Sequence, residues 1–179
     1  GFGVAGFARL LGDRGPAYDG KLTLNPFVHV DIFGLFAGTV GRVGWVRPIA
    51  IDPAKGRIGR ATPVVVALLS MAAVFFFGRL VLLALPWVAT SWPTSSAAFT
   101  DATIRMMADV AAWTLAINII PIPPLLGGYL LFALAPGAHQ WLVKRHLYVS
   151  IALTVVIVLI YPSLPATPFG DLARFLGAR

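Results

Sequence analysis

The sequence contains no cysteine and no glutamate among its 179 residues. Without cysteine, the chain can form neither disulfides nor thiolate metal sites, and it has no cysteine nucleophile. Any mechanism that needs a glutamate as general base or metal ligand is excluded within this chain. Histidine is scarce, with only His29, His139 and His146. The acidic side chains are all aspartates: Asp13, Asp19, Asp31, Asp52, Asp101, Asp109 and Asp171.

Charged residues are also few, at 12% of the chain against 58% hydrophobic residues. A soluble domain carries about 25% charged residues, and the mean hydropathy here is +0.84. This composition predicts an integral membrane protein in contact with lipid. The net charge of +7 could suggest nucleic acid, but the basic residues lie between apolar runs. Positive-inside topology explains them better, and we expect no nucleic-acid partner.

Long apolar segments predict an all-α polytopic fold with about 3–4 transmembrane helices in one membrane domain, residues 1–179. A helix of about 20 residues crosses the hydrocarbon core. We expect spans at 62–85, 100–120 and 147–161, and we interpret 1–12 as the end of an upstream helix. Residues 20–52 are broken by glycines, which favours a re-entrant or short β-hairpin segment. Residues 137–146 are expected to form a polar turn.

The basic residues indicate an orientation. Five of them precede the first span and two precede the last, so both segments are expected on the cytoplasmic side of a multi-pass protein, in a bacterial inner membrane. These residues are Arg42, Arg47, Lys55, Arg57, Arg60, Lys144 and Arg145.

Two short motifs carry little functional weight. GFGVAG at 1–6 matches G-x-G-x-x-G, but no βαβ unit surrounds it, so close helix packing explains it better than a dinucleotide. His139 and His146 are seven residues apart and flank two cations, which disfavours a zinc site.

Charged residues also lie within the predicted membrane helices. Asp101, Arg105 and Asp109 share one helix face, and ionisable groups at such depth are functional candidates. An internal ion ladder, or a pairing with Arg79, is the structural alternative that we favour.

Small residues mark two possible docking faces. Gly34 and Gly38 form a G-x-x-x-G pattern, and Ser150 and Thr154 lie four residues apart on the last predicted span. Small residues allow close helix approach in lipid. We therefore expect one of these faces to dock on other integral membrane protein subunits, although a hairpin turn would explain the two glycines equally well.

Three segments, in order, resemble the site-2 protease family of intramembrane zinc metallopeptidases. LTLNPFVHVDIFG resembles the family's N-P-x-x-H-x-D stretch. GWVRPIAID, residues 44–52, resembles its G-W-x-[KR]-P segment, and LAINIIPIPPLLGGYLL resembles its N-L-I-P-I-P-P-L-D-G-G segment. The resemblance covers roughly residues 1–135. The matched residues in the first and third segments are Asn25, Pro26, His29, Asp31, Asn118, Pro121, Pro123, Pro124, Gly127 and Gly128.

The resemblance implies a zinc held by two histidines of H-E-x-x-H and by the aspartate of the L-D-G segment, with the glutamate as general base. This sequence departs at those positions. Leu126 replaces the aspartate, and alignment on Gly12-Asp13 puts the second histidine at Val4. Residues 1–13 contain neither histidine nor glutamate. His29 and Asp31 are not zinc ligands in that pattern, and we expect them to serve the turn and its hydrogen bonds.

These departures favour a non-catalytic pseudoprotease without a cofactor, acting as an accessory subunit of a membrane complex. Two alternatives remain open. One is an active intramembrane metalloprotease with displaced ligands. The other is a small transporter or channel subunit that uses Arg79, Asp101, Arg105 and Asp109.

Overall fold

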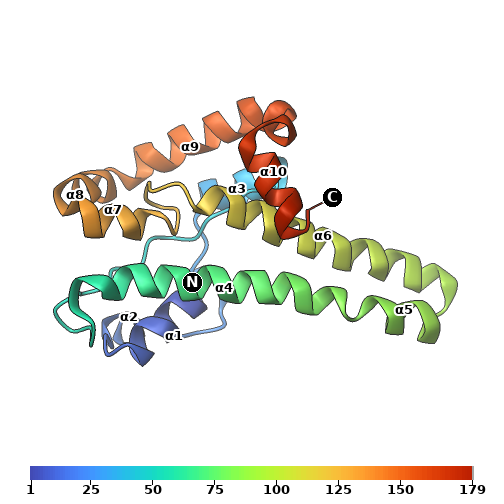
Figure 1. Ribbon diagram of the computed structural model, residues 1–179, viewed down its shortest axis with the longest axis horizontal. Helices are drawn as coiled ribbons and strands as arrows, with labels where there is room; N and C mark the ends of the chain where they lie inside the picture. The colour runs from blue at the N-terminus through green and yellow to red at the C-terminus, as the bar shows by residue number, and fades with distance from the viewer. Residues whose placement is uncertain (179) are drawn as a thin grey trace.

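A computed structural model describes residues 1–178, which fold entirely into helices and connecting loops (Figure 1). No β-strand occurs in this part of the chain. The elements in order are α1 (Phe2–Leu10), α2 (Gly15–Tyr18), η1 (Pro26–Val28), α3 (Ile32–Gly41), η2 (Gly59–Ala61), α4 (Thr62–Leu82), α5 (Leu85–Ser91), α6 (Thr94–Asn118), α7 (Gly128–Leu134), α8 (Pro136–Lys144), α9 (His146–Ile160), η3 (Tyr161–Ala166) and α10 (Pro168–Leu176), where η marks a 3-10 turn.

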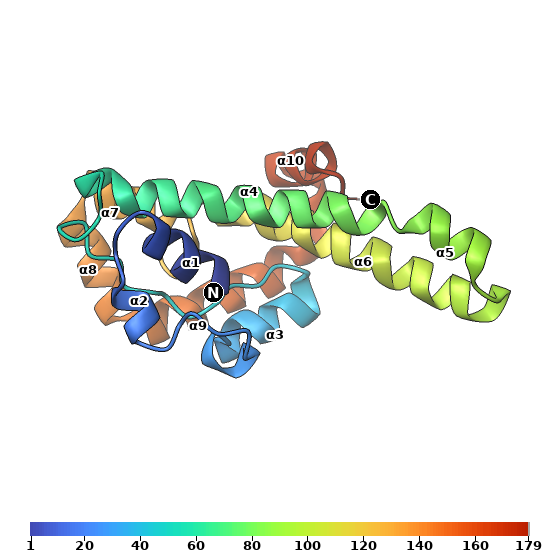
Figure 2. The same cartoon turned by 90° about the horizontal axis from the view of Figure 1, so that it is seen from below.

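The longest feature is a helical hairpin in which α4 and α6 run antiparallel along the long axis (Figures 1 and 2). Pro63 lies in the first turn of α4, where its missing N–H costs no hydrogen bond. Gly78 faces α6, and a Cβ added there would lie 3.1 Å from Ala111 Cβ. The small side chain lets the two helices approach closely.

The remaining helices pack on this hairpin. α1 lies against α4, α10 lies against α6, and α3 pairs with α9 (Figure 2). A core cluster joins α3, α6, α9 and α10 through Ala37, Trp113, Ile157 and Ala173. This cluster fastens the α3–α9 pair and α10 to α6 of the hairpin.

The prediction of 3–4 transmembrane helices is wrong by count. Within residues 1–178, two helices are long and apolar enough to cross a membrane, at Gly59–Ser91 and His146–Ala166. Only 22% of the most apolar stretch of each is buried, whereas the core helix of a soluble protein is mostly buried. α6, predicted as a span at 100–120, has 25 residues but carries Asp101, Arg105 and Asp109, which lower its hydropathy.

Two local predictions also need correction. Residues 20–52 contain no β-hairpin among the described residues; they form η1 and α3, with one isolated bridge between Val30 and Val46. A helix forms because the Asp31 carboxylate caps α3, accepting hydrogen bonds from the backbone N–H groups of Phe33 and Gly34. The predicted polar turn at 137–146 is mostly α8, which Pro136 starts and Lys144 ends.

Candidate functional site

A cavity of about 760 Å³ lies between α1, α3, α4 and α6. It brings together residues from both ends of the family resemblance, because Val4 of α1 and Leu126 of the loop before α7 both line it. His29, Asp31 and Asn118 line the same cavity. The fold thus gathers the positions that the sequence singled out, although they are far apart along the chain.

Val4 and Leu126 also belong to one apolar cluster. Val4 is 4% exposed and packs with Ala8, Ile49 and Val66, and the partly buried Leu126 lies against this cluster. By the alignment given above, these are two of the three positions where the family pattern has zinc ligands. In this chain they present only alkyl groups, which cannot donate a lone pair to a metal.

The residues of the N-P-x-x-H-x-D stretch shape the backbone at the cavity wall. Asn25 Oδ1 accepts a hydrogen bond from the Phe27 N–H and caps η1, in which Pro26 is the first residue. Asp31 caps α3 as described above. His29 Nε2 lies 3.0 Å from the Thr23 carbonyl oxygen, and the Arg47 N–H donates to the His29 carbonyl. These contacts are of the kind expected for His29 and Asp31, whose role in the chain stays a prediction.

Asn118 closes the proline-rich loop between α6 and α7. Its Nδ2 donates to the Thr114 carbonyl, and its Oδ1 accepts from the Leu126 N–H at 2.9 Å. This loop, which holds Pro121, Pro123 and Pro124, returns the chain to α7. Its glycines are sterically required: a Cβ at Gly127 would overlap the Ile120 carbonyl oxygen, and one at Gly128 would lie 2.7 Å from Pro123 N.

The cavity wall holds two buried polar atoms without a hydrogen-bond partner, His29 Nδ1 and Trp45 Nε1. Because His29 Nε2 faces a carbonyl oxygen, it carries the proton, and Nδ1 is left as an acceptor. The rest of the cavity lining is largely apolar. Sequence reasoning included Trp45 only as part of the G-W-x-[KR]-P segment and did not single out its ring N–H.

The residues present do not fit a catalytic zinc. Such sites use three protein ligands and an open position, and residues 1–178 contain no group of three or more His, Cys, Asp or Glu side chains that could hold a metal. Near the cavity, only His29 and Asp31 have suitable atoms, and Asp31 Oδ1 already accepts two backbone hydrogen bonds. We therefore derive no step through a metal.

The charged residues of α6 form ion pairs, but not as one ladder. Arg105 Nε lies 2.6 Å from Asp101 Oδ2. Asp109 pairs instead with Arg42 at the end of α3, at 2.6 Å. Arg79 lies over the Phe75 ring and beside Gly177. The Arg42–Asp109 contact was not predicted, although an arginine in an otherwise apolar segment was a usable signal.

The four residues expected to dock on a partner have contacts within this chain. Gly34 lies against Trp45, and Gly38 lies against Gly44. Ser150 is fully buried, and Thr154 Oγ1 donates to the Ser150 carbonyl, with the Phe33 carbonyl of α3 at 3.3 Å. Ser150 and Thr154 therefore lie on the side of α9 that contacts α3, whereas Gly34 and Gly38 pack on segment 44–45. Docking on a partner through these faces stays a prediction.

One known protein is similar to most of the chain. "Putative zinc metalloprotease YwhC" of Bacillus subtilis (strain 168) is 26% identical over 152 residues, which cover 83% of this chain and 69% of that protein. No protein-family model matches the chain, and no solved structure matches it. The weak similarity supports a protease-like family for this chain and agrees with the three segments described above.

Proposed function

We propose that this chain is a non-catalytic membrane relative of the site-2 proteases, and that it serves as a structural or accessory subunit of a larger membrane complex. The observation that carries the proposal is the pair Val4 and Leu126, which lie in one apolar cluster where the family pattern has zinc ligands. The similarity to a protein named as a zinc metalloprotease supports the kinship. The apolar pair supports the loss of catalysis.

The cavity gives the accessory role a physical basis. Ligand sites are concave and mostly apolar with a few polar groups, and their volumes run from about 300 to 1,000 Å³. A largely apolar cavity of about 760 Å³ has the size and the lining to take an apolar segment of a partner. In this proposal an apolar segment of a partner protein binds in the cavity and is not cleaved.

Two alternatives are less well supported. An active protease with displaced ligands would have to take its zinc ligands from His29 and Asp31, and Asp31 is occupied as a helix cap. A transporter that uses the charges of α6 would need them available to a solute. Instead Asp101 and Asp109 each pair with an arginine of the same chain.

The loss of catalysis is tested by metal analysis and peptide cleavage with the purified protein. We expect well below one zinc per chain after dialysis against zinc-containing buffer, and no cleavage of an apolar membrane peptide. Leu126→Asp alone should create neither property, because Val4 would still lack a donor atom. Stoichiometric zinc with cleavage in the unaltered protein would support the displaced-ligand enzyme.

The subunit role needs a separate experiment. Ala73→Trp places a large side chain into the cavity from α4, and Leu80→Trp is the matched control because Leu80 is 65% exposed and lies outside that cavity. On native gels of mildly solubilised membranes, we expect a high-mass complex for the unaltered chain and Leu80→Trp, and a smaller species for Ala73→Trp. A single small species for the unaltered chain would contradict the subunit role.

A further inference from the structure

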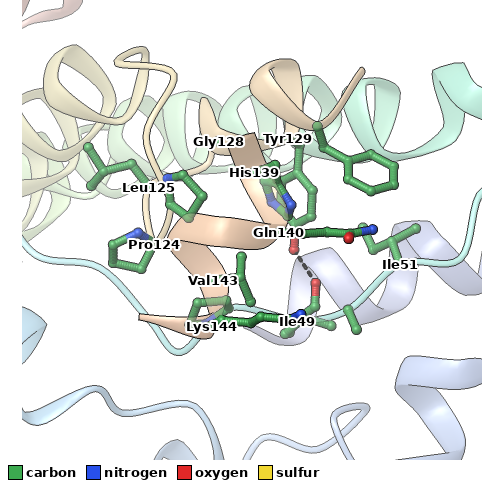
Figure 3. A pocket seen from close by; sticks show the side chains of 14 residues that line it. Ile49, Ile51, Pro124, Leu125, Gly128, Tyr129, His139, Gln140, Val143 and Lys144 are labelled. Carbon is green, nitrogen blue, oxygen red and sulfur yellow. Dashed lines mark hydrogen bonds between the residues drawn. The ribbon is translucent and has the colours of Figure 1, made fainter. Parts of the chain in front are cut away.

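A second pocket, of about 350 Å³, lies apart from the cavity described above, between the extended segment 48–51 and the helices α7 and α8 (Figure 3). Its walls are apolar: they include Ile49, Ile51, Leu125, Phe132 and Val143. The pocket reaches the size range of small-molecule sites. The Tyr129 hydroxyl donates to the Ile49 carbonyl at 2.6 Å, so this buried hydroxyl is paired within the fold.

Apart from Tyr129 of α7, the polar side chains of the pocket come from α8. Figure 3 shows His139, Gln140 and Lys144 beside the apolar wall. The His139 ring meets Phe132 edge-on at 5.0 Å, and burial lowers the pKa of His139, which keeps it neutral at pH 7. Lys144 is exposed and forms no ion pair within residues 1–178. It therefore supplies the pocket's one positive charge.

The pocket lies where both candidate spans begin. Segment 48–51 leads toward the span at Gly59–Ser91, and Lys144 immediately precedes the span at His146–Ala166. Figures 1 and 2 show α7, α8 and the start of α4 at the same end of the molecule. The cations at these span starts outnumber the neighbouring acids, of which Asp52 already pairs with Lys55. The cations near the two span starts are Arg47, Lys55, Arg57, Arg60, Lys144 and Arg145.

We propose that this pocket binds an anionic phospholipid of the inner leaflet, with one acyl chain among Ile49, Phe132 and Val143 and the headgroup phosphate on Lys144. The proposal rests on the membrane location and is independent of whether the chain is catalytic. Apolar walls, a single cation at the edge and a place at the membrane interface are the three features that an anionic amphiphile requires.

A lipid fits these features better than a peptide or a free anion. An apolar peptide segment would leave the charge of Lys144 without a negative partner. A free phosphate would gain nothing from the apolar walls. A zwitterionic lipid has the same phosphate, but its own choline cation offsets the attraction to Lys144. The combination therefore selects an acyl chain and a negative headgroup on one molecule.

The test uses the full chain, purified, delipidated and titrated with phosphatidylglycerol or phosphatidylcholine under native mass spectrometry. We expect phosphatidylglycerol to bind more tightly than phosphatidylcholine. Lys144→Ala should lower the affinity for phosphatidylglycerol about fivefold, which is the factor expected from one cation near an anionic surface. It should leave phosphatidylcholine unchanged, and Lys144→Arg should restore the preference. Lys55→Ala is the control, because Lys55 pairs with Asp52 outside the pocket.

The apolar part is tested with Val143→Trp and Ala50→Trp, which fill the pocket from opposite walls. Either variant should lose affinity for both lipids, with its helix content checked by circular dichroism. Equal binding of the two lipids by the unaltered chain would overturn the proposal, as would a Lys144→Ala variant with full preference for phosphatidylglycerol. Glycerol phosphate bound as tightly as the lipid would indicate a free-anion site and would also overturn it.

Discussion

At the scale of single residues, the contact between Arg42 and Asp109 distinguishes two kinds of charge on α6. The Asp109 side chain is 11% exposed, whereas Asp101 is 41% exposed and pairs within one helix turn. We expect Asp109→Asn to lower the free energy of unfolding by about 1–3 kcal/mol, because a charged hydrogen bond is lost at a buried site. Asp101→Asn should cost less than about 1 kcal/mol. Denaturant unfolding in detergent measures both, and equal costs would contradict this ranking.

A second residue-scale prediction concerns pH. Burial lowers the pKa of His139 below its ordinary value of 6.5. As the pH falls, His139 is therefore protonated in the unfolded chain before it is protonated in the folded protein. The contribution of neutral His139 to stability is fully present above the ordinary pKa and is lost as the pH falls below it. The melting temperature should decrease as the pH is lowered from about 7.5 to about 5.5. His139→Gln should make this drop smaller, and an undiminished drop in that variant would assign the effect to other groups.

At the scale of elements, α3 is held against segment 44–46 by glycines that differ in tolerance. A Cβ at Gly34 would overlap the Trp45 carbonyl oxygen, whereas one at Gly38 would lie 3.6 Å from Gly44 Cα, an ordinary contact. Gly34→Ala should therefore cost about 1–3 kcal/mol of stability, as overpacking does. Gly38→Ala should be close to neutral. Thermal unfolding of the two variants checks the difference, which would vanish if α3 could simply shift.

At the scale of the whole molecule, exposed apolar surface predicts where the chain resides. The two candidate spans are only 22% buried in their most apolar stretches, so their remaining surface needs lipid or partner contacts. We expect the protein to stay in the membrane pellet after an alkaline carbonate wash and to be released by detergent. Release by carbonate alone would mean that neither helix is inserted.

The sequence predicted the helical architecture and the gathering of the motif residues better than it predicted the number of spans. Hydropathy located α4 and α9 well, because their apolar runs are uninterrupted. It overestimated α6, because length was weighed above the charges at Asp101, Arg105 and Asp109. The glycines within residues 20–52 suggested a re-entrant or hairpin segment, but the Asp31 side chain caps a helix at Ile32–Gly41.

The candidate site was only partly accessible from the sequence. The resemblance identified Val4 and Leu126, and the structure places them in one cluster. The cavity depends on how α3 and α9 are placed relative to α4 and α6, which no local pattern encodes. The pocket beneath α8 was missed for the same reason, since residues 137–146 were predicted to form a turn.

The polar residues that reveal the kinship have a common task in this molecule. The Asp13 carboxylate accepts hydrogen bonds from the N–H groups of Gly15 and Asp52. Asp31 caps α3, and Asn118 accepts a hydrogen bond from the Leu126 N–H. All three side chains accept hydrogen bonds from backbone N–H groups. Replacing them would therefore damage folding whether or not the chain cleaves a peptide. Selection on folding alone can preserve such residues. Resemblance at these positions therefore reports on shared backbone structure and is silent on the chemistry that the chain performs.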